Sequence, residues 1–132
     1  MALLKLPEVN SVCVAGNLTK DPTYNTTNKN ASVVNFHIAV NRSYKTSDNK
    51  RKEDVCYVGV VAWNKLAESC KQHLRKGSPV MVEGMLQSKT FEIEESPNLT
   101  IVEIKAKKIQ FLNKLSEEEE NAHQLSAETT LG

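Results

Sequence analysis

Hydrophobic and polar residues alternate most regularly over residues 33–41. Val34, Phe36, Ile38 and Val40 share one parity, and the residues between them are small or polar. A period of two predicts a β-strand with one buried face and one face in solvent. Apolar or alternating runs predict further strands over residues 9–15, 55–63, 80–87 and 99–111.

The last two predicted strands should each turn one apolar face towards a core. These faces are formed by residues of one parity: Val80, Val82, Gly84 and Leu86 in the fourth strand, and Val102, Ile104 and Ala106 in the fifth. Glu103 and Lys105 fall on the other parity of the fifth strand, so we expect their side chains to lie outside the core.

A single helix is predicted between the third and fourth strands. Apolar residues recur at helical spacing from Leu66 to Leu74, and Asn64 is expected to cap the helix N-terminus. Gly77, followed by Ser78-Pro79, is expected to end the helix.

The predicted order of elements is therefore strand, strand, strand, helix, strand, strand. Polar stretches without a period, residues 24–32 and 43–53, are predicted to be loops. This order fits an all-β fold, a five-stranded Greek-key barrel of the OB type with one helix between strands 3 and 4. A five-stranded α+β sandwich is the alternative.

Charge is distributed unevenly along the 132 residues. Residues 1–115 contain all 17 Lys and Arg residues and 11 Asp and Glu residues, a formal charge of +6. Residues 116–132 contain five Glu residues and no Lys or Arg, a formal charge of −5. We therefore expect a basic domain over residues 1–115 with a polyanionic partner, followed by a short, disordered, acidic tail over residues 116–132.

Membrane and secreted proteins are disfavoured by the apolar segments of the chain. No apolar run approaches the roughly 20 residues of a membrane span, and residues 1–7 lack the basic region of a signal peptide. We expect a cytoplasmic protein. Cys13, Cys56 and Cys70 are an odd number of cysteines without metal-ligand spacing, so we expect buried thiols in a reducing compartment and no metal site.

Enzymatic activity is not indicated by any motif. The sequence has no phosphate-binding glycine loop and no Gly-x-Ser-x-Gly motif, and His37, His73 and His123 are isolated from one another. His37 lies on the polar face of its strand, where a surface histidine is the expected role rather than a ligand contact. We expect neither catalysis nor a cofactor.

Aromatic residues are combined with basic ones in a pattern typical of nucleic-acid binding. Phe36 and Phe111 sit among apolar neighbours and are expected in the core. Four other aromatic residues fall on outward parity or in loops beside Lys and Arg: Tyr44, Tyr57, Trp63 and Phe91. Exposed rings can stack on unpaired bases, and nearby cations neutralise phosphates. The residues alone leave open that Tyr57 and Trp63 pack under a loop or against a neighbouring subunit.

Several segments resemble those of bacterial single-stranded DNA-binding proteins. The similar segments are VAGNLTKDP at residues 14–22, VVNFHIAVNR at 33–42, VVAWNKLAE at 60–68, LRKGS at 74–78 and VMVEGML at 80–86. They occur in the family's order without large gaps, and the resemblance covers about residues 9–112.

The resemblance implies an OB barrel, a homotetramer, and the coating of single-stranded DNA without sequence specificity during replication, recombination and repair. It implies a location in the cytoplasm, in association with the nucleoid. The family's base-stacking positions fall on Tyr44, Tyr57, Trp63 and Phe91. Its phosphate-contacting positions are expected at Arg42, Lys45, Lys65, Arg75, Lys76 and Lys89.

Two features depart from the family pattern. Tryptophan is frequent at the family's stacking positions, whereas three of the four here are Tyr or Phe, which implies lower affinity per base. The acidic Pro-Phe tip through which bacterial members recruit replication and repair enzymes is absent, since the chain closes with Thr129-Thr130-Leu131-Gly132. The absence of the tip speaks against recruitment of replication and repair enzymes by that route. Three explanations stay open: a truncated chain, a short paralogue, or recruitment through another surface. An OB module that bridges proteins and an RNA-binding OB domain are the alternative functions.

Overall fold

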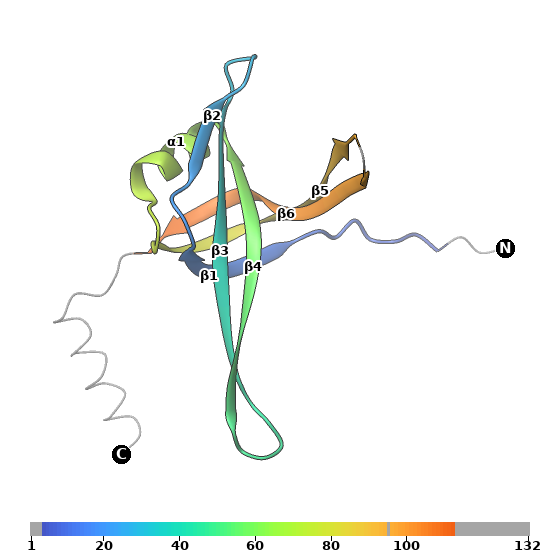
Figure 1. Ribbon diagram of the computed structural model, residues 1–132, viewed down its shortest axis with the longest axis vertical. Helices are drawn as coiled ribbons and strands as arrows, with labels where there is room; N and C mark the ends of the chain where they lie inside the picture. The colour runs from blue at the N-terminus through green and yellow to red at the C-terminus, as the bar shows by residue number, and fades with distance from the viewer. Residues whose placement is uncertain (1–3, 95, 113–132) are drawn as a thin grey trace.

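The computed structural model describes residues 4–94 and 96–112 (Figure 1). The acidic tail expected at residues 116–132 lies outside them. The described elements are β1 (Val12–Leu18), β2 (Thr23–Thr26), β3 (Ser32–Lys45), β4 (Arg51–Trp63), α1 (Asn64–His73), β5 (Pro79–Ile93) and β6 (Ser96–Phe111).

The strands form a closed barrel. They are ordered β1-β5-β6-β4-β3-β2, and a further pairing between β1 and β3 joins the sheet to itself. β2 pairs only with β3 and adds a short antiparallel strand outside the five that close the barrel. The predicted five-stranded barrel is confirmed, as is the single helix between its third and fourth strands.

The core lies inside this barrel and under α1. Val34, Phe36 and Ile38 of β3 are buried, as the alternation predicts, and Phe111 packs against the same core. Gly16 and Gly84 lie where neighbouring backbones approach most closely, since an added Cβ would collide with the carbonyl groups of Ala39 and Lys105. Glycine therefore permits tight strand crossings at both positions.

The two ends of α1 differ from the prediction. The N-cap position is Trp63, whose backbone is extended, and no side chain caps the helix. Asn64 has a φ of 57° and is already the first residue of the helix, because β4 leads directly into it. The helix ends at His73, with Leu74 as C-cap, and Gly77 (φ 88°) lies in the connection to β5. The predicted capping role of Asn64 is wrong, and the helix ends earlier than predicted.

The stretch over residues 24–32 is not entirely a loop. Its first part belongs to β2, which pairs with β3 from Thr23 opposite Asn35 to Thr26 opposite Ser32. The Tyr24 hydroxyl donates a hydrogen bond to Ser32 Oγ at 2.8 Å. Polar side chains hid this strand from the alternation pattern, since most of its residues are exposed.

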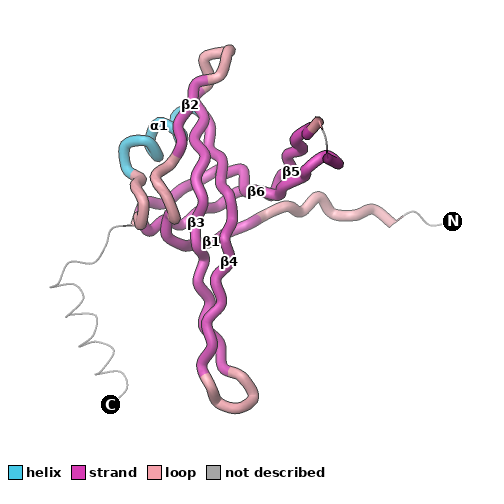
Figure 2. Tube along the Cα trace, in the orientation of Figure 1, coloured by secondary structure: helices cyan, strands magenta, loops and turns pink. Residues whose placement is uncertain are grey.

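The stretch over residues 43–53 is also largely β-structure. β3 and β4 remain paired as far as Lys45 opposite Arg51, and only residues 46–50 form the connecting loop. The resulting β3–β4 arm, residues 41–55, projects well beyond the barrel (Figure 2). Both of its faces are largely exposed, so the sequence shows no apolar period there.

A second arm is formed by β5 and β6, over residues 86–94 and 96–102. Leu86 and Val102 were expected in the core, but 46% and 61% of their surfaces are exposed because the strands have left the barrel at these positions. Glu103 lies outside the core as expected, yet only 6% of its surface is exposed. A register shift between Glu83 and Gly84 changes which residues face inward further along β6, where Ile109 is buried.

The cysteines occupy two kinds of environment. Cys70 on α1 is buried, and its burial raises the pKa of the thiol to about 12. Cys13 and Cys56 are exposed, so the expectation of three buried thiols is wrong for two of them. Cys13 lies on the outward parity of β1, whereas Cys56 shares the parity of Val58 and Val60 and is exposed because it lies at the base of the β3–β4 arm.

Candidate nucleic-acid interface

The outer face of β3 and β4 carries two of the aromatic residues that the sequence singled out, Tyr57 and Trp63. On β4, Tyr57, Gly59 and Trp63 alternate with residues that face the core. Tyr57 is 69% exposed and Trp63 is 38% exposed. The register places Tyr57 opposite Ala39 and Gly59 opposite His37. Ala39 and Gly59 are small, so the ring of Tyr57 projects above the sheet.

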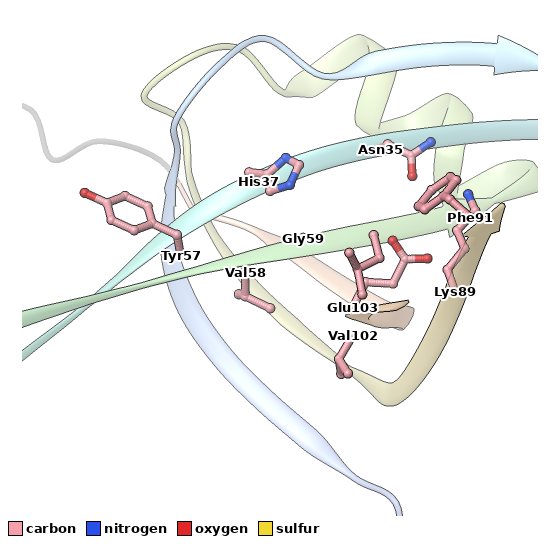
Figure 3. A pocket seen from close by; sticks show the side chains of 10 residues that line it. Asn35, His37, Tyr57, Val58, Gly59, Lys89, Phe91, Val102 and Glu103 are labelled. Atoms are coloured by element: carbon pink, nitrogen blue, oxygen red, sulfur yellow. The ribbon is translucent and has the colours of Figure 1, made fainter. Parts of the chain in front are cut away.

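A hollow of about 450 Å³ lies on this face between Tyr57 and the β5–β6 arm. Figure 3 shows Tyr57 at one end and Phe91 at the other, with Gly59 between them. Phe91 is 43% exposed, and the Lys89 ammonium lies 5.6 Å from the centroid of its ring. Two flat apolar rings and a cation therefore border one open depression.

A second hollow of about 430 Å³ is lined by Trp63 and adjoins the first. The two hollows share Asn35, Lys89 and Glu103. We call the two hollows together the aromatic groove. Tyr57 and Trp63 of the aromatic groove come from β4, and Phe91 comes from β5, the next strand along the chain. The residues shared by the two hollows connect the three rings.

Tyr44 lies apart from the aromatic groove. It is half-buried on the β3–β4 arm, where the Arg42 guanidinium carbon lies 4.9 Å from the centroid of its ring. It lines a separate, shallow hollow with Ser43, Lys45 and Arg51. The structure thus brings three of the four predicted stacking residues together and places the fourth, with two of the predicted phosphate contacts, on the arm.

The remaining predicted phosphate contacts are distributed unevenly. Lys89 lines both hollows of the aromatic groove. Lys65, Arg75 and Lys76 are exposed on or just after α1, and they line neither hollow. The backbone N–H of Lys76 donates to Asp21 Oδ1 at 2.8 Å, which ties this corner to the turn after β1.

The floor of the aromatic groove contains polar residues that the sequence analysis did not select. Asn35 and His37 come from β3, and Gln87 and Glu103 from β5 and β6. Glu103 accepts a hydrogen bond through Oε1 from Gln87 Nε2 at 3.0 Å. Gln87 and Glu103 lie directly opposite each other on β5 and β6. Only the register of these two strands shows that the two side chains are neighbours.

Two negative observations concern the described residues alone. In residues 4–94 and 96–112, no three or more His, Cys, Asp or Glu side chains are grouped so that they could hold a metal ion. None of the helices in that part of the chain is long and apolar enough to cross a membrane.

Comparison with known proteins gives consistent matches. The model of the single-strand binding protein family matches residues 9–112. Single-stranded DNA-binding protein 2 of Chlorobaculum tepidum is 59% identical over 110 residues, which are 83% of this chain and 74% of that protein. The single-stranded DNA-binding protein of Oceanobacillus iheyensis is 35% identical over 104 residues, 79% of this chain and 63% of that protein.

A solved structure shares the fold. The Plasmodium falciparum SSB, in its complex with ssDNA, superimposes with a TM-score of 0.76 at 22% sequence identity. The match covers 83% of this chain and all of that one, which confirms the predicted OB barrel. With the family model spanning most of the barrel and a relative at 59% identity, the chain belongs to the single-strand binding protein family.

Proposed function

We propose that this protein binds single-stranded DNA without recognising a defined sequence, and coats it during replication, recombination and repair. The observation that carries the proposal is the aromatic groove, in which Tyr57, Phe91 and Trp63 stand exposed beside Lys89. Each stacked base contributes about 1–3 kcal/mol whatever its identity, because every base has a π-face. The protein acts by binding and forms or breaks no covalent bond.

Phosphates would be held by cations at the edges of this path. Lys89 lies beside Phe91, and Arg42 and Lys45 accompany Tyr44 on the β3–β4 arm. A DNA strand that runs from the aromatic groove to the β3–β4 arm therefore meets aromatic and basic side chains in alternation. Lys65, Arg75 and Lys76 would extend the basic path over α1 in longer strands.

We also propose that several copies assemble, as a homotetramer, to share one strand of DNA. The support is an open sheet edge, because residues 12–15 of β1 pair with β5 on one side and, among the described residues, with no strand on the other. An unpaired edge is a template for pairing with a second copy, which gives a dimer; the further step to a tetramer rests on the family resemblance. Linked sites raise the effective concentration of each groove, so modest affinities per copy would give tight binding.

The test is a titration of a dT oligomer of a few tens of nucleotides, followed by tryptophan fluorescence at two salt concentrations. Trp63 is the one tryptophan of the sequence, so its emission reports on the aromatic groove alone. We expect saturable quenching that weakens at higher salt, since released counterions contribute to binding. A folded protein that shows no quenching would remove Trp63 from the interface and favour a module that bridges proteins.

A further inference from the structure

A carboxylate is buried at the point where the two hollows of the aromatic groove meet. Glu103 is 6% exposed and lines both hollows. Figure 3 shows its carboxylate directed into the first hollow, on the side of Asn35 and Phe91. The hydrogen bond from Gln87 Nε2 to Oε1, 3.0 Å long, holds the carboxylate in this orientation.

A carboxylate in this position does not help to bind the backbone of a polyanion, because like charges repel. It suits the edge of a nucleobase instead, since a fixed, charged oxygen is a strong hydrogen-bond acceptor. The phosphates then lie on the outer side, near the Lys89 ammonium, which is placed 5.6 Å from the Phe91 ring centroid.

Gly59 keeps the approach to this carboxylate open. A Cβ at position 59 would lie 3.3 Å from His37 Nε2 and 3.8 Å from the Cβ of Glu103. Any larger side chain would therefore fill the floor between Tyr57 and Phe91. With glycine there, a flat ring stacked on either aromatic residue has room to turn its edge towards Glu103.

We propose that this junction is a subsite for a nucleobase with an exocyclic amino group, and that Glu103 accepts a hydrogen bond from that group. Cytosine and adenine carry such donors at N4 and N6, and guanine carries one at N2. Thymine has no exocyclic amino group; its carbonyl oxygens O2 and O4 would face another acceptor, and its one N–H donor is the ring N3–H. The inference rests on the proposed function, and it describes a preference between base classes at one position, not the reading of a sequence.

The test compares the affinities of dC and dT oligomers of equal length for the wild-type protein and for Glu103→Gln. The two oligomers carry equal charge, so the change in their affinity ratio between the two proteins isolates the base contact of residue 103. We expect Glu103→Gln to lower the affinity for dC relative to dT by about three- to tenfold, because the base contact loses its charge and glutamine offers only a neutral carbonyl acceptor.

A matched control is Glu83→Gln on β5, which makes the same change of charge at a residue that lines neither hollow. Removing a negative charge there should change both affinities equally and leave the ratio unaltered. A folded Glu103→Gln protein with the wild-type ratio would overturn the proposal, as would a ratio altered equally by Glu83→Gln. If the wild-type protein binds neither oligomer, the proposed function itself fails.

A second measurement on the wild-type protein does not depend on the folding of any variant. Cytosines are replaced by 2-pyrimidinone, which lacks only the exocyclic amino group. We expect the affinity to fall by about three- to tenfold, as for loss of one base contact. Unchanged affinity would overturn the proposal, and would mean that the Gln87–Glu103 pair only stabilises the β5–β6 arm.

Discussion

Tyr57 is the most exposed ring of the aromatic groove, with 69% of its surface in solvent. Removing an exposed ring leaves no cavity, so we expect Tyr57→Ala to change the free energy of unfolding by less than about 0.5 kcal/mol. We expect it to weaken binding of a dT oligomer by about 1–3 kcal/mol, the contribution of one stacked base. Fluorescence titration and a thermal melt give the two quantities.

Tyr57→Phe is the matched control, since it keeps the ring and removes only the hydroxyl. It should bind the dT oligomer as the wild-type protein does. A Tyr57→Ala protein with a lower melting temperature and unchanged affinity for the dT oligomer would assign the ring to packing instead of stacking.

The buried thiol of Cys70 gives a prediction about pH. Burial raises the thiol pKa from an ordinary value of 9.0 to about 12, because the thiolate loses its hydration in the core. The native state therefore holds this proton more tightly than the unfolded chain does. The corresponding stability is fully present below pH 9.0 and is lost as the pH rises towards about 12.

Alkylation followed by mass spectrometry checks the state of the thiols. At mildly alkaline pH we expect rapid modification of Cys13 and Cys56, which are exposed, and protection of Cys70. Denaturant should expose the third thiol. Equal rates at all three positions in the native protein would contradict the burial of Cys70.

At the residue scale, the alternation of residues along a strand predicted which side chains are exposed only where the strand has a buried face. It correctly placed Tyr57 and Trp63 outside and Phe36 inside. It also placed Glu103 on the outer face, but it could not show that only 6% of this side chain is exposed, because that depends on neighbouring strands and on partners such as Gln87. It also could not show that Tyr44 lies apart from the other three rings.

The β3–β4 arm separates the contribution of Tyr44 from that of the groove. Tyr44 lines its own hollow on the arm, so a short oligomer that fills the aromatic groove would not reach it. We expect Tyr44→Ala to leave the affinity for an oligomer of about 6 nucleotides unchanged and to weaken binding of one of about 30 nucleotides, given site sizes of roughly 4–16 nucleotides per OB fold.

Phe91→Ala serves as the comparison, because Phe91 borders the groove itself. It should weaken binding of both oligomers. Equal losses from Tyr44→Ala at both lengths would mean that the arm and the groove bind the same few nucleotides.

At the element scale, the pattern located the barrel strands, although the first lies at Val12–Leu18 and not at residues 9–15, and it underestimated the β3–β4 arm. Backbone pairing extends β3 to Lys45 and starts β4 at Arg51, whatever the polarity of their side chains. The short strand β2 is likewise held by backbone pairing and by Tyr24, with little apolar surface of its own. Such pairing is visible in the structure and leaves no period in the sequence.

For the whole molecule, the uneven charge predicts how binding responds to salt. Residues 1–115 carry a formal charge of +6, and each phosphate neutralised on a single strand adds about 0.7 to the salt slope. We expect Lys89→Ala to reduce the slope of log K against log salt by about 0.7 in magnitude. Titrations of a dT oligomer over several salt concentrations measure it.

Lys107→Ala provides the control, since Lys107 is exposed on β6 and lines neither hollow. Its slope should match that of the wild-type protein. A slope that falls equally in both variants would indicate that general charge, and not a contact at Lys89, governs binding.

The architecture of the whole molecule followed from the order of its elements, because few folds place one helix between the third and fourth of five strands. The residue pairs that close the barrel did not follow, since they are short pairings between segments distant in the sequence. β1 meets β3 through Asn17 and Leu18, and β4 meets β6 through Val60 and Val61.

These short pairings have a consequence for hydrogen exchange. The parallel seam between β4 and β6 joins two residues on each strand, whereas β3 and β4 are paired from Val33 to Lys45. The hydrogen bonds along the seam should therefore open, and their amides exchange with solvent, before those of the long β3–β4 ladder. A strand of DNA in the groove would touch Tyr57 and Trp63 on one side of the seam and Glu103 on the other. Occupancy of the groove would then slow hydrogen exchange at the seam, where only two residue pairs join β4 to β6.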